Sequence, residues 1–278
     1  MTKQTVNLGS VQETLLIPLF SRALETARPN GLLKDTRAEE IVDQLEYDFS
    51  KWPPSSSWSQ ACIRTRLFDD IALDFLAQHP DGVIVEIGCG LNTRFERIDN
   101  GQATWFDLDL PDSIELRRVF FEDTPRRTMI AGSVFDEDWM EPVLKVGKPT
   151  LFLSEAVLIY FEEAEVKQAI VQIAEKFPGA GFATDICTSK LTTPKAQERG
   201  KRVLGISSWF KWACDDPKSI EAWYPGTEFV GSQTYVDASK DIIAKMPAIW
   251  RALTTIAPFF VRYLVKDYRI AHYRLGRS

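Results

Sequence analysis

The chain has 278 residues, of which 45% are hydrophobic, so it can bury a substantial core without disulfides or a structural metal. It carries 33 lysines and arginines against 39 aspartates and glutamates, a formal net charge of −6. This balance gives no electrostatic reason to expect binding to nucleic acid or to an anionic membrane, and it favours a small-molecule or peptide partner.

The cysteines and the N-terminal sequence indicate in which cellular compartment the protein is expected. The four cysteines are widely spaced, with no CxxC pair and no neighbouring histidine, so we expect free thiols and no metal site. The N-terminus lacks the basic and then apolar pattern of a signal peptide. No uncharged apolar run approaches the roughly 20 residues that span a bilayer. These features favour a cytoplasmic protein.

Helical patterns dominate the first part of the chain. The predicted helices are Val11–Ala27, Thr36–Phe49 and Trp58–Gln78. Thr36 is the expected N-cap of the second helix, with Glu39 completing a capping box. We expect residues 1–80 to form a helical cap on the rest of the protein.

From Gly82 onward, short apolar runs alternate with helical stretches at the spacing of βαβ units. The predicted strands are Val83–Ile87, Ala103–Leu108, Arg127–Ala131, Thr150–Ser154 and Gly181–Asp185. The clearest helix between them is Glu162–Phe177. This alternation predicts a parallel sheet flanked by helices.

An insertion of about residues 188–225 follows the fifth strand, with helices expected around Thr193–Trp212 and at Asp216–Trp223. A strand near Glu228–Tyr235, a long helix over Met246–Val265 and a last strand at Tyr268–Leu275 complete the pattern. Five parallel strands and a final hairpin-like pair indicate a Rossmann-like α/β fold with a seven-stranded, mostly parallel sheet. Residues 81–278 are expected to form this core, within a single domain overall.

The strongest local motif is the segment VIVEIGCGLNTR at residues 83–94, in which an apolar strand runs into a tight glycine turn and then a helix. Gly88 and Gly90 permit positive φ and let a ligand approach the backbone. Thr93 stands where the dinucleotide fingerprint has its third glycine, so a nicotinamide cofactor is disfavoured.

Acidic residues lie at the carboxyl ends of the first two predicted strands. Glu86 directly precedes the glycine turn and suits a sulfonium cofactor whose amino acid tail carries a free ammonium group. Asp107 and Asp109 end the second strand about 20 residues after the glycines, where a carboxylate can accept both ribose hydroxyls. Ser133 and Val134 follow the third strand, at a position that can reach the adenine.

Glu155 follows the fourth strand, so its carboxylate is expected to face cofactor or substrate. Together with Glu155, the motifs described above resemble those of the leucine carboxyl methyltransferase family and its bacterial relatives, the tetracenomycin-type polyketide O-methyltransferases. These proteins are class I S-adenosylmethionine-dependent methyltransferases. The similar segments cover nearly the whole chain: ETLLIPLFSRA (13–23), RTRLFDD (64–70), GCGLNTR (88–94), DLDLP (107–111) and SEAVLIY (154–160).

The resemblance implies an S-adenosylmethionine-dependent O-methyltransferase that releases S-adenosylhomocysteine. By this resemblance Gly88 and Gly90 form the cofactor turn, Asp109 binds the ribose, and Ser133 with Val134 contacts the adenine.

The resemblance also implies roles at the methionyl end of the cofactor. Glu155 lies beside that end, while Arg22 and Arg64 meet the cofactor's carboxylate from the N-terminal helices. The family usually carries aspartate where this chain has Asn92, which removes one negative charge near the cationic cofactor.

Methyl transfer from a sulfonium mainly requires alignment of the reactants and exclusion of water, so no catalytic nucleophile is expected. A carboxylate acceptor, with a reference pKa near 4, arrives ionised, whereas a phenol near 10 is usually helped by a base. Of the two histidines, His79 is predicted at the far edge of the sheet and His272 within the last strand. This scarcity favours a small-molecule or peptide carboxylate as acceptor.

Arg66, Glu155 and Tyr160 are the candidate positioning residues. Arg66 binds a substrate carboxylate if it points inward and is a solvated helix residue if it points outward. A hydroxyl (phenolic) O-methyltransferase of secondary metabolism and a catalytically decayed cofactor-binding protein are the alternatives. The sequence does not fix the acceptor or the oligomeric state.

The insertion is rich in aromatic and basic residues. Its large aromatics are Trp209, Phe210, Trp212 and Trp223. They either cap the acceptor pocket or attach the insertion to the sheet, and we favour the second interpretation because such aromatics are common core residues. The lysines and arginines among them are expected to form a solvated face.

Overall fold

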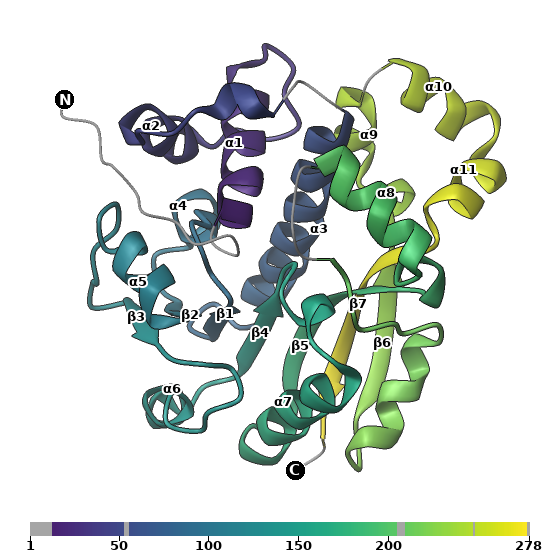
Figure 1. Ribbon diagram of the computed structural model, residues 1–278. Coiled ribbons are helices and arrows are strands. Elements are labelled where there is room, and N and C mark those ends of the chain that lie inside the picture. The colour runs from purple at the N-terminus through teal and green to yellow at the C-terminus, as the bar shows by residue number, and fades with distance from the viewer. Residues whose placement is uncertain (1–12, 53–55, 205–208, 247, 277–278) are drawn as a thin grey trace.

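The computed structural model describes residues 13–52, 56–204, 209–246 and 248–276. A seven-stranded sheet with the order β3-β2-β1-β4-β5-β7-β6 lies at its centre (Figure 1). The parallel strands are β1 (Val83–Ile87), β2 (Thr104–Asp109), β3 (Arg127–Ala131), β4 (Thr150–Ser154) and β5 (Ala180–Cys187). The antiparallel strands are β6 (Glu228–Gln233) and β7 (Tyr268–Leu275). The predicted Rossmann-like α/β fold is confirmed.

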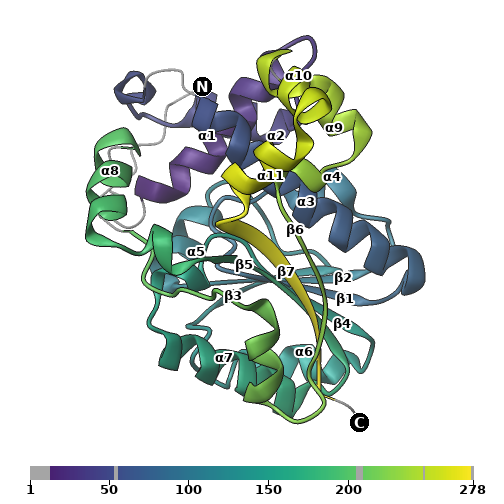
Figure 2. The same ribbon diagram turned by 90° about the vertical axis from the view of Figure 1, so that its right-hand side faces the viewer.

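The central strands are apolar because helices cover both faces of the sheet. All residues of β1 and β4 are buried, and Val85 of β1 is flanked by Phe106 and Phe152 on its neighbours. Parallel strands covered on both faces are near-continuous apolar runs, which explains why these strands could be read from the sequence. Helix α3 (Ser56–Gln78) covers one face, and α6 (Met140–Val146) and α7 (Glu163–Lys176) cover the other (Figure 2).

The remaining helices connect the strands or lie above the carboxyl ends of the parallel strands. The α-helices are α1 (Glu13–Ala27), α2 (Thr36–Gln44), α4 (Arg94–Ile98), α5 (Pro111–Arg117), α8 (Pro194–Leu204), α9 (Lys240–Lys245), α10 (Ala248–Ile256) and α11 (Pro258–Val265). The 3-10 helices are η1 (Phe49–Lys51), η2 (Leu158–Tyr160), η3 (Ser189–Leu191), η4 (Pro217–Trp223) and η5 (Tyr235–Asp237). Helices α1 and α8 both lie above that end of the sheet (Figure 1).

The N-terminal helices share a core with the glycine turn. Leu16 and Leu19 of α1 are fully buried and pack in one cluster with Cys89, Leu91 and Ile114. Helix α1 therefore covers the turn after β1. The division of the chain into a cap of residues 1–80 and a core stays a prediction, and Val11 and Gln12 of the first predicted helix lie outside the described residues.

The predicted capping box at Thr36 is wrong. Asp35 is the N-cap of α2, because its Oδ1 accepts a hydrogen bond from the Ala38 backbone amide at 2.9 Å. The helix also ends earlier than the predicted Phe49: Gln44 is its last residue, and Leu45 has extended backbone.

The single long helix predicted over residues 246–265 is also wrong. Met246 has extended backbone, and the segment forms two helices, α10 and α11. Pro258 is the first residue of α11, where its missing amide hydrogen costs nothing but where it cannot continue a preceding helix. In the insertion, α8 covers residues 194–204, and the described residues 209–214 are not helical.

Candidate active site

A cavity of about 1360 Å³ opens at the carboxyl ends of the parallel strands. Its walls come from the glycine turn after β1, the loops after β2, β3 and β4, and the helices α1, α3 and α8. Typical ligand cavities measure about 300–1,000 Å³, so this one is large enough for a nucleoside cofactor together with a second molecule.

The glycine turn forms the floor of the cavity. Gly88 and Gly90 have φ of 66° and 46°, which side chains rarely adopt. A Cβ on Gly88 would lie 2.3 Å from a methyl carbon of Val157, so the turn packs directly against the loop that follows β4. Glycine at position 88 therefore brings the ends of β1 and β4 together.

Asp109 lies at the end of β2 and lines the cavity. Its Oδ2 accepts from the Gly90 amide at 2.7 Å, and its Oδ1 accepts from the Leu110 amide at 2.7 Å. Burial raises the pKa of this carboxyl, while the two amides oppose that rise. The Ser113 side chain is a third hydrogen-bonding partner of Asp109, and a carboxylate has about four acceptor sites, so the group retains capacity for a ligand hydroxyl.

Asp107, two residues earlier on the same strand, does not line the cavity. Asp107 is only 1% exposed, and its Oδ2 accepts hydrogen bonds from Arg117 Nη2 at 3.0 Å and from Arg127 Nε at 2.6 Å. The two aspartates, which the sequence assigns to the cofactor together, therefore have different environments in the structure. Asp109 faces the cavity, while Asp107 forms ion pairs with two buried arginines.

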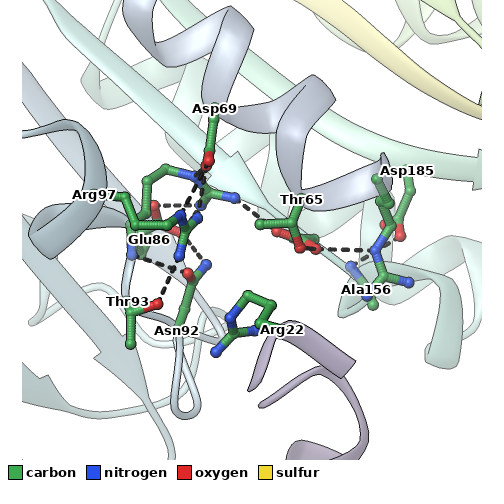
Figure 3. Close-up of polar contacts among 12 residues, drawn as sticks. Arg22, Thr65, Asp69, Glu86, Asn92, Thr93, Arg97, Ala156 and Asp185 are labelled. Atoms are coloured by element: carbon green, nitrogen blue, oxygen red, sulfur yellow. Dashed lines mark hydrogen bonds and ion pairs between the residues drawn. The ribbon is translucent and has the colours of Figure 1, made fainter. Parts of the chain in front are cut away.

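Buried arginines and carboxylates form a network of ion pairs, shown in Figure 3. The Arg94 side chain is fully buried and contacts three carboxylates, those of Asp69 at 2.8 Å, Glu86 at 2.5 Å and Glu155 at 2.6 Å. Burial alone would lower the pKa of Arg94, but Glu86 and the other two acids raise it above its usual value. Arg94 therefore carries a permanent charge that these carboxylates compensate.

The same network connects the N-terminal helices to the turn. Arg97 bonds Asp69 at 2.8 Å and approaches Asp35 at 3.3 Å. Arg22 of α1, which lines the cavity, donates to Asp35 at 2.8 Å and to the Leu91 carbonyl at 2.8 Å. The sequence did not indicate roles for Arg94 and Arg97, because their partners Asp69 and Glu155 are distant in the chain and meet them only in the fold.

Glu155 lines the cavity, but it is also fully engaged. Arg64 Nε donates to its Oε1 at 3.0 Å, and Thr65 Oγ1 donates to the same oxygen at 2.9 Å. Burial raises the pKa of Glu155, but Arg64 and Arg94 outweigh burial and lower it to about 2. Glu155 is therefore ionised at neutral pH, and two arginines balance its charge.

Glu86 and Asn92 lie together on the cavity wall. Burial raises the pKa of Glu86, and Arg94 acts against that rise. Asn92 Nδ2 donates to Glu86 Oε2 at 3.4 Å. An aspartate at position 92 would instead bring a second carboxylate against Glu86, so the asparagine avoids a like-charge contact here.

Asp185 and Tyr268 form a pair that sequence reasoning missed. The Tyr268 hydroxyl lines the cavity and donates to Asp185 Oδ2, which also accepts from the Ala156 amide at 2.9 Å. Among the described residues, the other oxygen, Asp185 Oδ1, has no hydrogen-bond partner. Burial raises the pKa of Asp185 to about 6, although Arg64 and Tyr268 oppose it. The sequence signal was present, since Asp185 ends a predicted strand.

Tyr268 is also part of an aromatic wall of the cavity. The wall consists of Tyr160, Trp209, Phe210, Tyr235 and Tyr268. Trp209 stacks on Phe210 with ring centroids 4.6 Å apart, and Tyr235 stacks on Tyr268 at 5.9 Å. The wall offers flat apolar ring surface together with three tyrosine hydroxyls.

The aromatics of the insertion therefore divide into two groups. Trp212 and Trp223 belong to the core of the sheet, as the favoured interpretation expected, whereas Trp209 and Phe210 line the cavity. The expectation that the basic residues simply form a solvated face is incomplete. Four of them line the cavity: Lys190, Lys195, Arg199 and Lys211.

Arg66 points away from the cavity. Its Nη1 donates to the Leu32 carbonyl at 3.1 Å, and its Nη2 lies 4.0 Å from Asp241. Neither histidine lines the cavity: His79 packs on the Phe75 ring, and His272 is half-buried on β7.

Other predicted residues do lie at the cavity. Ser133 and Val134 line it after β3, where Ser133 Oγ accepts from the Phe135 amide at 3.2 Å. Tyr160 lines it from η2, and Arg64 lines it from α3.

Sequence similarity relates the chain to known methyltransferases. Residues 16–174 match the family model for leucine carboxyl methyltransferase. The chain is 31% identical over 237 residues to the tetracenomycin polyketide synthesis O-methyltransferase of Streptomyces glaucescens, covering 84% of this chain and 87% of that protein. It is 27% identical over 252 residues to an S-adenosyl-L-methionine-dependent methyltransferase of Gibberella zeae, covering 82% and 84%.

A solved structure extends the likeness of the fold to nearly the full length. A DUF574 family protein from Streptomyces avermitilis superimposes with a TM-score of 0.59 at 12% identity, covering 94% of this chain and 96% of that one. Within the described part of this chain, no helix is both long and apolar enough to cross a membrane. The chain belongs to the leucine carboxyl methyltransferase family of S-adenosylmethionine-dependent O-methyltransferases.

Proposed function

We propose that this enzyme methylates a carboxylate of a small molecule or a peptide terminus. The charge of the cavity supports the proposal: six basic residues line it against four acidic ones, and in the described part of the chain no histidine does. A carboxylate arrives ionised and is attracted to such a cavity, and it needs no base to become a nucleophile. The fully engaged Glu86 and Glu155 are poorly placed to act as bases.

We assign the cofactor to the half of the cavity around the glycine turn. Gly88 and Gly90 would let it approach the backbone, Asp109 would bind the ribose hydroxyls, and Ser133 with Val134 would flank the adenine. The open lone pairs of Asp109 and the buried, apolar Val134 support this assignment. When bound, S-adenosylmethionine supplies an electrophilic methyl group carried on a sulfonium.

The methionyl end of the cofactor is assigned to the charged residues of the cavity. Arg22 and Arg64 would attract its carboxylate, and Glu86 and Glu155 would face its ammonium group and sulfonium. The near balance of arginines and carboxylates there suits a ligand that carries both charges.

The aromatic wall is assigned to the acceptor. Tyr160 and Tyr268 would orient the acceptor through their hydroxyls, and Trp209 with Phe210 would exclude water. These residues catalyse by holding the acceptor in position. We further propose a reducing, cytoplasmic location, which is supported by four free and buried cysteines.

The stability of the product tests the proposed acceptor. The enzyme would be incubated with methyl-labelled S-adenosylmethionine and paired aromatic acceptors, for example 2-naphthoate and 2-naphthol. We expect label in 2-naphthoate that mild base releases, because an ester hydrolyses and an ether does not. Label that enters only the naphthol and survives base would overturn carboxylate methylation.

Hydroxyl methylation is the second candidate, and the Asp185–Tyr268 pair favours it. A phenol could pass its proton to the Tyr268 oxygen while the Tyr268 proton moves to Asp185. Asp185 is deprotonated above its pKa of about 6, so such a reaction would accelerate as the pH rises through 6.

Substituting Asp185 distinguishes the two acceptors. We expect Asp185→Asn to change kcat for a carboxylate acceptor by less than about threefold and to leave no step near pH 6 in the rate profile. General base catalysis contributes about 100-fold or more, so a hydroxyl acceptor would lose about that much and its dependence on pH near 6. Asp138→Asn, which changes an exposed aspartate outside the cavity, serves as the control.

A further inference from the structure

Helix α8 presents two cations to the cavity from one face. Lys195 and Arg199 are four residues apart, which places them one above the other on a helix, and both line the cavity. Ala196 and Gly200, on the adjoining part of the same face, line it too. This face of the helix is therefore the one turned toward the cavity.

The position of α8 is fixed by its contact with the aromatic wall. A Cβ on Gly200 would lie 2.1 Å from the Trp209 ring, so the helix backbone rests directly on that ring. Trp209 Nε1 donates in turn to the Leu191 carbonyl at 2.7 Å, just before α8. The cations are thereby held beside the flat surface formed by Trp209 and Phe210.

These two cations are not used for internal ion pairs. Lys190 lies 3.4 Å from Asp267, and Lys211 lies 3.7 Å from Glu162. In contrast, Lys195 and Arg199 make no ion pair with any residue that the structure describes. In a chain with a net charge of −6, two unpaired cations on a cavity wall form a local positive charge that attracts an anionic ligand.

We propose that the α8 face is an anion-binding subsite for the acceptor. The subsite takes a carboxylate or phosphate group that the acceptor carries in addition to the oxygen that is methylated. Trp209 and Phe210 bind the apolar part of the acceptor that joins these two groups. This inference rests on the proposed methylation of an acceptor in this cavity and specifies its class, an aromatic molecule with a second anionic group.

Binding of matched probes tests the subsite. Protein saturated with S-adenosylhomocysteine would be titrated by calorimetry with 2-naphthoate, 2,6-naphthalenedicarboxylate and 6-phosphonooxy-2-naphthoate. We expect both doubly acidic probes to bind about tenfold more tightly than 2-naphthoate, the effect of two exposed charge pairs of about 0.7 kcal/mol each. The tighter of the two identifies carboxylate or phosphate as the preferred group.

Two double variants provide the comparison. Lys195→Gln/Arg199→Gln is expected to reduce the preference to less than about twofold and to leave binding of S-adenosylhomocysteine unchanged. Lys167→Gln/Lys218→Gln removes two exposed lysines outside the cavity and should retain the full preference.

Three results would overturn the subsite: equal binding of all probes to the wild type, no binding of any probe, or a preference that persists in the α8 variant. The readout is binding, so a hydroxyl product in the methylation assay would contradict the proposed acceptor oxygen without deciding this test.

Discussion

Replacing Asp109 with alanine is expected to weaken binding of S-adenosylhomocysteine about 100-fold. The carboxylate oxygens of Asp109 face the cavity with open lone pairs, and two hydrogen bonds from ribose hydroxyls to a charged acceptor would be lost. At about 1.5 kcal/mol each, that loss amounts to about 3 kcal/mol, or two powers of ten in Kd. Calorimetric titration measures it.

Two controls separate ligand binding from folding. Asp138→Ala removes an exposed aspartate outside the cavity and should leave the Kd unchanged. Asp109→Asn retains an acceptor for the Gly90 amide, and its urea midpoint shows whether the turn has been preserved. A Kd within threefold of the wild type in folded Asp109→Ala would refute the ribose assignment.

Replacing Arg94 with methionine is expected to lower the free energy of unfolding by about 3–5 kcal/mol. The substitution preserves much of the side-chain volume but leaves Asp69, Glu86 and Glu155 without their shared cation in a buried site. Removing one partner of a buried ion pair costs the desolvation of the charges that remain. Urea denaturation followed by circular dichroism measures the change.

Arg274→Met provides the matched control. Arg274 is largely exposed on β7 and lies 3.7 Å from Glu228, so its loss should cost less than about 1 kcal/mol. If Arg94→Met were no more destabilising than Arg274→Met, the network would not stabilise the fold as described.

The sheet could be predicted from the sequence because strands that are buried on both faces consist almost entirely of apolar residues. In β1 and β4 every residue is buried, so each appears as an uninterrupted apolar run. The glycine turn was equally visible, since Gly88 and Gly90 need positive φ. Helix ends were harder, because the cap at Asp35 depends on Arg22 of another helix as well as on its own neighbours.

The candidate site could be predicted only in part. Asp107 and Asp109 point to the same side of their strand, and only the distant Arg117 and Arg127 decide that Asp107 is sequestered. Arg64 and Arg66 are a different case. Residues two apart on a helix point about 200° apart, so helical geometry already argues that both cannot face one cavity.

The place of the cationic face of α8 on the cavity wall could not be predicted from the local sequence. Lys195 and Arg199 read as ordinary solvated residues, and they are indeed exposed. They line the cavity because Gly200 of the same helix packs on Trp209. This tertiary contact cannot be inferred from helix propensity.

The central claim is that the cavity at the carboxyl ends of the strands holds S-adenosylmethionine. The most direct measurement is a calorimetric titration of the purified protein, free of carried-over ligand, with S-adenosylhomocysteine and, in parallel, with NAD. Saturable binding of one molecule of S-adenosylhomocysteine per chain, with none of NAD, is the predicted result. Absence of S-adenosylhomocysteine binding by folded protein would contradict the account.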